Sequence, residues 1–141
     1  MASDELIYHR LTDSKRREVL DRLSEALGRN GRIELAYVFG SFTRRSSVRD
    51  IDVAIYAVPP LSLREQVGLM AELELDLGMS VDIVQIQKVD PAFRLSILRK
   101  GLPLVVRSTD LRNGLISQAF TELRDHEMAM NRLSELKSVP T

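Results

Sequence analysis

Two aspartates stand one residue apart at the start of an apolar run, in the sequence DIDVAIY of residues 50–56. Successive side chains of a strand point to opposite faces, so Asp50 and Asp52 share one face and the residues between them line the other. Two carboxylates this close repel each other, and burial makes the repulsion worse. A cation between them would offset it, and Mg²⁺ is typically held by few carboxylates plus substrate phosphates. The pair therefore indicates a Mg²⁺ site.

A third carboxylate comes from a later apolar run, SVDIVQI, residues 80–86. There Asp82 alternates with a valine and an isoleucine, and so it points away from the face that those residues bury. If this strand lies beside the strand of Asp50 and Asp52, the three acids share one face. Three carboxylates on neighbouring strands can hold two metal ions about 3.5–4 Å apart, the arrangement used in phosphoryl and nucleotidyl transfer.

The loop before the two aspartates has residues suited to binding phosphate. Gly40 lets the backbone turn tightly, and Ser41 offers a hydroxyl and a backbone N–H in a turn of the kind that binds phosphate oxygens. Arg44, Arg45 and Arg49 place positive charge where a triphosphate would lie. Other interpretations remain open at this point. The arginines fit a solvated basic loop equally well, and the acids could be solubilising charges at a strand edge.

The elements that must hold these residues alternate between helix and strand. The pattern predicts an α/β (α+β) domain with a small mixed sheet of three to four strands, flanked by helices. A single domain is expected over residues 1–141, with a core of about 13–107. Helices are predicted at 13–29, 63–78, 90–101 and, as one long C-terminal helix, at about 109–137, and strands at 32–40, 50–58, 80–86 and 102–107.

Capping residues and alternation locate several of these elements. Ser62 and Glu65 have the spacing of a capping box, and Gly78 would end that helix. The glycines of GRNG, residues 28–31, suit positive φ after the first helix. In the first strand, alternation places Ile33, Leu35, Tyr37 and Phe39 on one face.

Composition excludes several classes of protein. The 141 residues include no cysteine, which excludes thiolate metal sites and disulfides. The only two histidines, His9 and His126, are far apart in the sequence, so we do not expect a histidine metal cluster. Lysine plus arginine equals aspartate plus glutamate, so the net charge gives no reason to expect nucleic-acid binding. Without a membrane-length apolar run or a signal-like N-terminus, we expect a cytoplasmic protein.

The segment GSFTRRSSVRDIDVAI followed by VDIV resembles the nucleotidyltransferase superfamily of the DNA polymerase β type, and the small size points to the minimal nucleotidyltransferases (MNT). The resemblance covers roughly residues 15–107. Two departures are visible. The eight-residue loop 42–49 is shorter than usual in the family, and Arg45 stands about where a second glycine is common.

The resemblance implies transfer of AMP from ATP to a hydroxyl, with Mg²⁺ as cofactor. Many MNT proteins are antitoxins of HEPN ribonucleases and adenylylate a tyrosine of the toxin, so the implied partner is a HEPN-type toxin in a possible hetero-oligomer. Asp50, Asp52 and Asp82 would bind the metals, with Asp82 also helping to deprotonate the acceptor. Gly40 and Ser41 would hold the terminal phosphates. Two alternatives remain: transfer to a small hydroxyl compound, and an inactive antitoxin that neutralises its partner by contact.

Overall fold

The chain is described by a computed structural model that covers residues 9–43 and 47–138. Its helices and strands follow the predicted alternation. The helices are α1 (Asp13–Gly28), α2 (Leu63–Leu77), α3 (Pro91–Lys100) and α4 (Thr109–Ser138), with short 3₁₀ helices η1 (Gly40–Thr43) and η2 (Ile86–Lys88). The strands are β1 (His9–Arg10), β2 (Ile33–Phe39), β3 (Ser47–Val48), β4 (Asp50–Ala57), β5 (Ser80–Gln85) and β6 (Leu102–Val106).

Four of the strands form one mixed sheet in the order β5-β4-β2-β6. Strands β4 and β5 are parallel, and α2 crosses between them, whereas β2 is antiparallel to both of its neighbours. This confirms the predicted α/β fold with a small mixed sheet. The sequence did not predict the separate pairing of β1 with β3, which are two residues each and too short to give a periodic pattern.

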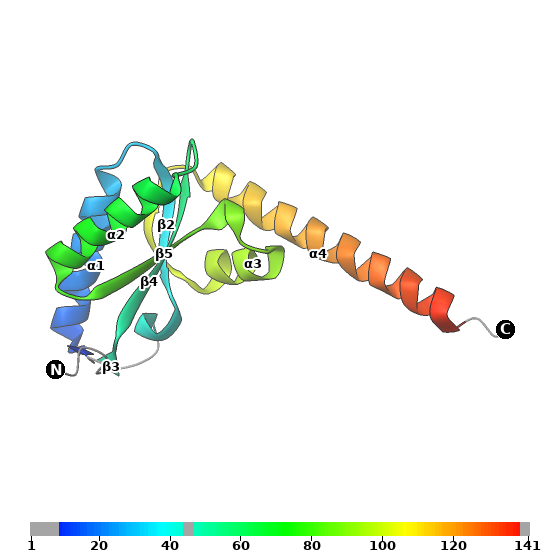
Figure 1. The fold of residues 1–141 in the computed structure, drawn as a ribbon, viewed down its shortest axis with the longest axis horizontal. Coiled ribbons are helices and arrows are strands. Elements are labelled where there is room, and N and C mark those ends of the chain that lie inside the picture. The colour runs from blue at the N-terminus through cyan, green and yellow to red at the C-terminus, as the bar shows by residue number, and fades with distance from the viewer. Residues whose placement is uncertain (1–8, 44–46, 139–141) are drawn as a thin grey trace.

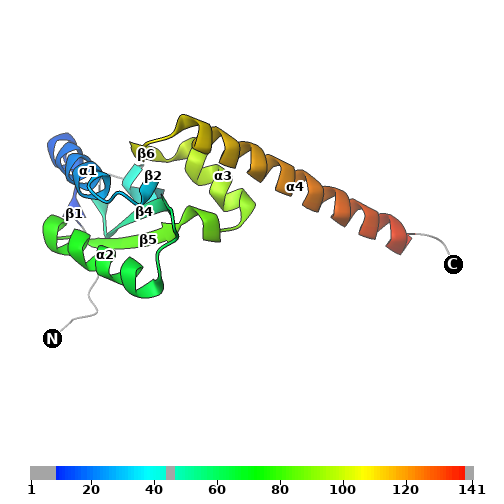
Figure 2. The ribbon, with the colours of Figure 1, turned by 90° about the horizontal axis from the view of Figure 1, so that it is seen from above.

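Helices cover both faces of the sheet (Figures 1 and 2). Helices α1 and α2 pack on one face through Val19, Leu23 and Leu27 of α1 and Leu73 and Leu77 of α2. Helix α3 and the first part of α4 pack on the other face, where the buried side chains are Leu35, Tyr37, Ala54, Ile86, Ile97, Leu98 and Leu115. The predicted acids lie on this second face, because the residues that alternate with them belong to the first core, namely Ile51 and Val53 on β4 and Val81 and Ile83 on β5.

The helix ends follow the capping residues in three cases. The Ser62–Glu65 capping box is present, and Gly78 ends α2 in the left-handed conformation at φ +67°. Asp90 caps α3 by accepting a hydrogen bond from the Phe93 backbone N–H. The first helix does end in GRNG, at Gly28, but the expected positive φ was wrong, since neither glycine there has it and the cap residue Arg29 is right-handed.

One irregularity changes the faces of β2. The register shifts between Ile33 and Leu35, so Ile33 faces the α1–α2 core whereas Leu35 and Tyr37 face α3 and α4. The predicted alternation therefore holds from Leu35 to Phe39 and was wrong for Ile33. An extra residue in one strand of a pair shifts the following side chains to the opposite face.

Helix α4 packs on the domain only at its start. Leu115 and Ala119 are buried, and Arg94 of α3 forms an ion pair with Glu122 at 3.3 Å. Beyond that point the helix extends away from the sheet (Figure 1), and Met128, Met130 and Leu133 are about half exposed. None of the helices in the described ranges has the length and apolar character needed to cross a membrane.

Candidate active site

The strand register brings the predicted acids together on one face. In the parallel pair of β4 and β5, Asp52 lies directly opposite Asp82, and Asp50 lies opposite Ser80. Paired residues of neighbouring strands point to the same side of a sheet. The expectation that the strand of Asp82 lies beside the strand of Asp50 and Asp52 is therefore confirmed.

The three carboxylates differ in their surroundings. Asp52 is partly buried and Asp82 is exposed. Burial raises the pKa of Asp52 above its ordinary value, and the negative charges of Asp82 and Asp50 raise it further. Asp50 is paired with Arg49, whose Nε lies 3.0 Å from Asp50 Oδ2. A cation near Asp52 would offset the repulsion that these three charges create.

The side chains do not yet converge. Within residues 9–43 and 47–138, no three acidic or histidine side chains form a group ready to hold a metal ion. One oxygen of the Asp50 carboxylate accepts a hydrogen bond from Arg49 Nε. The backbone thus places three acids on one face, and their role as metal ligands stays a prediction.

The backbone turn at Gly40 lies against the Asp52 carboxylate. The end of β2 places Phe39 opposite Asp52, and the chain then turns at Gly40 with φ +76°. A Cβ atom at this position would lie 2.6 Å from Asp52 Oδ2, closer than any van der Waals contact allows. Glycine is therefore required here both by the backbone conformation and by the neighbouring carboxylate. The predicted tight turn at Gly40 is confirmed.

The start of the loop is held from two sides. The Thr43 hydroxyl donates a hydrogen bond to the Gly40 carbonyl oxygen at 2.7 Å. Phe42 is fully buried, and the Arg16 guanidinium of α1 lies 4.8 Å from the centre of its ring. Ser41, between these anchors, is partly exposed. Two further predicted phosphate ligands, Arg44 and Arg45, lie outside the described residues.

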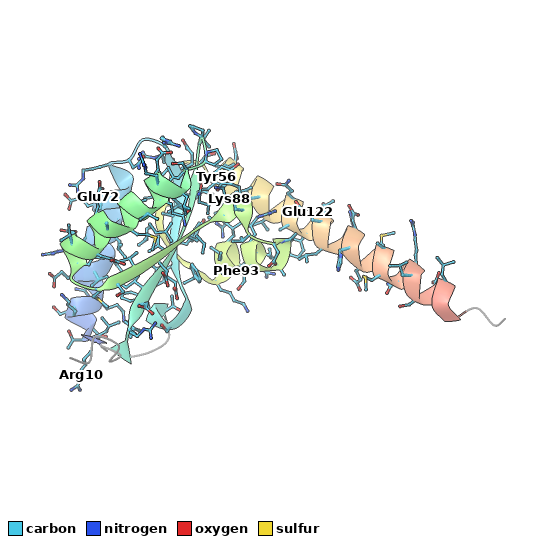
Figure 3. All side chains as sticks on the ribbon, in the orientation of Figure 1. Arg10, Tyr56, Glu72, Lys88, Phe93 and Glu122 are labelled. Atoms are coloured by element: carbon cyan, nitrogen blue, oxygen red, sulfur yellow. The ribbon has the colours of Figure 1, made fainter. Side chains whose placement is uncertain are left out.

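A hollow of about 500 Å³ opens between η1 and α3, beside Gly40. The rings of Phe39 and Phe93 meet edge to face at its wall, with centroids 5.5 Å apart and an interplanar angle of 78°. The α3 residues that line it lie on one stripe of the helix and were missed by the sequence analysis. Their spacing at i, i+3, i+4 and i+7 could have shown a shared face. They are Phe93 (labelled in Figure 3), Ser96, Ile97 and Lys100.

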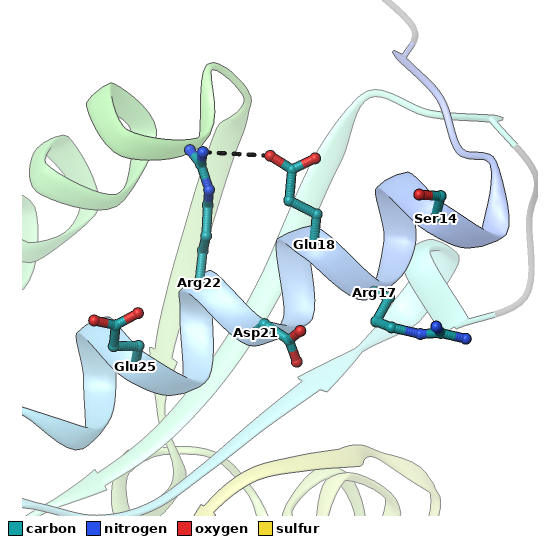
Figure 4. Close-up of a pocket in the computed structure, with 6 residues that line it drawn as sticks. All are labelled: Ser14, Arg17, Glu18, Asp21, Arg22 and Glu25. Atoms are coloured by element: carbon teal, nitrogen blue, oxygen red, sulfur yellow. Dashed lines mark ion pairs between the residues drawn. The ribbon is translucent and has the colours of Figure 1, made fainter.

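Another hollow, of about 450 Å³, lies along α1 (Figure 4). Its lining comes from this one helix, and the side chains include Glu18 and Arg22, which form an ion pair at 3.3 Å. Charged residues at helical spacing on an exposed face stabilise the helix itself. None of the predicted site residues borders this hollow.

The sequence from residue 21 to residue 110 matches the family described as polymerase beta, nucleotidyltransferase. Since this match covers more than half of the 141 residues, the chain belongs to that family. No curated protein matches the chain.

Solved structures with the same fold come from toxin–antitoxin complexes. A chain from a crystal structure of the toxin–antitoxin MntA–HepT matches at TM-score 0.67 and 16% identity, covering 87% of this chain and 99% of that one. A chain from the tri-AMPylated Shewanella oneidensis HEPN toxin in complex with MNT antitoxin matches at TM-score 0.68 and 17% identity, with coverages of 88% and 99%. A third, from a toxin–antitoxin with AMP-PNP, matches at TM-score 0.63 and 18% identity, with coverages of 92% and 100%. At these identities the matches show a shared fold.

Proposed function

We propose that this chain transfers AMP from ATP to a tyrosine hydroxyl of a HEPN-type toxin and thereby acts as its antitoxin. The observation that carries the proposal is the juxtaposition of Asp52 and Asp82 on parallel strands, with Gly40 packed against the Asp52 carboxylate. Family membership supports nucleotidyl transfer. The fold shared with chains from toxin–antitoxin complexes, one of them with an AMPylated HEPN toxin, supports this acceptor.

The reaction exchanges one phosphorus–oxygen bond for another. The tyrosine oxygen attacks the α-phosphorus of ATP, the bond from that phosphorus to the bridging oxygen breaks, and pyrophosphate leaves with the bonding electron pair. The phenolic proton passes to a base, for which the exposed Asp82 carboxylate is the candidate. Gly40 and Ser41 hold the terminal phosphates, and Asp52 lies between this loop and Asp82. The products are an AMP-tyrosine ester and pyrophosphate.

The donor set fits Mg²⁺. Carboxylate oxygens are its usual protein ligands, and the charges of Asp82 and Asp50 already raise the pKa of Asp52, so a cation would relieve real repulsion. Asp50, Asp52 and Asp82 would hold the ion. When bound, Mg²⁺ neutralises phosphate charge as the bond to pyrophosphate breaks. We therefore propose Mg²⁺ as the cofactor and ATP as the substrate.

The outer half of α4 offers a surface for the partner. Met130 and Leu133 continue the stripe of Leu115 and Ala119, which are buried, but in the described ranges nothing covers Met130 and Leu133. Apolar side chains at this spacing fit another helix, and the proposed HEPN partner is helical. Replacing Met130 and Leu133 together by glutamate should abolish complex formation while ATP binding by the isolated chain is retained.

Intact-mass spectrometry tests the transfer directly. The purified chain is incubated with ATP, Mg²⁺ and the HEPN-type product of the neighbouring gene. We expect the partner to gain the mass of one or more AMP groups, and Asp52→Asn and Asp82→Asn to prevent the gain. Omitting Mg²⁺ should have the same effect. A partner that stays at its unmodified mass with the wild-type chain would refute AMP transfer.

A second candidate is an antitoxin that neutralises its partner by contact alone. The favouring observation is that Asp50 is paired with Arg49 and that the three carboxylates do not converge. Growth of cells that produce the toxin separates the two readings. If Asp52→Asn still protects these cells, catalysis is dispensable and contact neutralisation is the correct function. Loss of protection, with the complex still formed, supports catalysis.

A further inference from the structure

We propose that α3 supplies the remainder of the nucleotide site: Phe93 binds the base by stacking, and Lys100 binds the polyphosphate. This inference rests on the proposed function, because it assigns the substrate of that reaction to the hollow between η1 and α3. The volume of about 500 Å³ is in the range of small-molecule sites. No residue of α3 was assigned a role by the sequence analysis.

The hollow adjoins the acidic group through Gly40. Gly40 and Phe39 form part of its wall, and the same two residues contact or oppose Asp52. A nucleotide in the hollow therefore lies on the Gly40 side of Asp52, and Asp82 lies on the opposite side, on β5. This separation leaves the side of Asp82 free for the acceptor hydroxyl.

Lys100 provides a positive charge with no ion-pair partner among the described residues. It is exposed in the last turn of α3 and lines the hollow beside Gly40, and its side chain forms no ion pair or hydrogen bond with any described residue. Arg99 stands next to it but turns to α4, where its guanidinium lies 5.8 Å from the centre of the Phe120 ring. The ammonium of Lys100 is thus free to bind a phosphate.

Phe93 provides a flat apolar surface at the other end of the stripe. Its edge-to-face contact with Phe39 fixes the ring, while 37% of the residue stays exposed. Lys100 lies seven positions further along the helix, about 10 Å along the axis. An aromatic surface and a cation at opposite ends of one hollow match the base and the polyphosphate of a nucleotide.

Two ligands measured by isothermal titration calorimetry in the presence of Mg²⁺ separate these roles. ATP tests both ends of the site, and inorganic tripolyphosphate tests only the phosphate end. We expect Lys100→Met to weaken the binding of both ligands about tenfold. Phe93→Leu should weaken ATP binding about tenfold and leave tripolyphosphate unchanged, and Phe93→Trp should restore ATP binding because it keeps a stacking surface.

Two matched variants serve as controls. Arg99→Met removes a charge from the same helix turn, and Phe120→Leu removes an exposed ring outside the hollow. Both should bind ATP within twofold of the wild type, and all variants should keep its circular-dichroism spectrum. The assignment is overturned if Phe93→Leu and Lys100→Met bind ATP like the wild type, if the controls lose as much, or if the wild type binds no ATP.

The mass assay distinguishes this outcome from failure of the proposed function. If the partner is modified at the wild-type rate by Phe93→Leu and Lys100→Met, the α3 site is wrong and AMP transfer stands. If calorimetry gives the expected pattern but the wild-type chain leaves the partner unmodified, the nucleotide site stands and the proposed acceptor is wrong.

Discussion

Replacing Gly40 by alanine tests whether the turn after β2 is built around Asp52. Two costs arise at this position. A residue with a side chain pays about 1–2 kcal/mol for the left-handed conformation, which Gly40 adopts at φ +76°. The added Cβ would also lie 2.6 Å from Asp52 Oδ2, so the carboxylate must leave its rotamer, at about 0.5–1.5 kcal/mol. We expect Gly40→Ala to lower the free energy of unfolding by about 1.5–3.5 kcal/mol.

Gly78 supplies the matched control. It has nearly the same φ, +67°, but nothing lies within 4 Å of an added Cβ. Gly78→Ala should therefore show the backbone cost alone, a fall in Tm of about 3–10 °C. In an Asp52→Ala background, Gly40→Ala should cost no more than Gly78→Ala. The coupling free energy between positions 40 and 52, from urea unfolding, should be about 0.5–1.5 kcal/mol.

Activity separates the two glycines more sharply than stability. A displacement of about 1 Å of a reacting group can cost about 100-fold in rate, so Gly40→Ala should lose about that factor in AMP transfer while Gly78→Ala stays within twofold. The rate is measured by the appearance of modified partner by mass spectrometry. Equal activity of the two variants, or a coupling free energy of zero, would refute the account of Gly40.

Three other predictions concern stability. The pKa of Glu65 lies below its ordinary value of 4.5, chiefly because the Ser62 backbone N–H donates to it. The wild type should therefore melt above Glu65→Gln at pH 7, and this difference should vanish as the pH falls through the depressed pKa. Gln85→Leu leaves the Leu61 N–H unpaired in the interior and removes one of the two donors to the Leu61 carbonyl, so it should cost about 1–3 kcal/mol in urea unfolding. Arg94→Met should cost about 1–3 kcal/mol, because it leaves the carbonyls of Ile86 and Val89 without this donor. It should also speed hydrogen exchange in α4, because Arg94 pairs with Glu122 of that helix; unchanged exchange there would contradict this.

The acids could be predicted from the sequence because their signal is local. Alternation alone places Asp50 and Asp52 on one face, and the same rule applies to Asp82. The pairing of Asp52 with Asp82 needed the parallel register, which depends on how α2 packs and not on any single residue. The reversal at Ile33 was missed because a bulge changes the face of a side chain without changing its type. Phe93 and Lys100 were missed because helix packing brings them to Gly40 from more than 50 positions away.

Helix α3 has one side against the hollow and the other against α4. Phe93, Ile97 and Lys100 line the hollow, and Arg94 joins the helix to Ile86 and to Glu122 of α4. The ten residues of α3 therefore lie between the proposed substrate site and the protruding helix α4. A force on the free end of α4, for example from a bound protein, would act first on α3, because α4 packs on the domain through that helix. A protein bound at the far end of α4 is thus linked to the hollow through a single helix, although it does not lie near the acidic residues of the site.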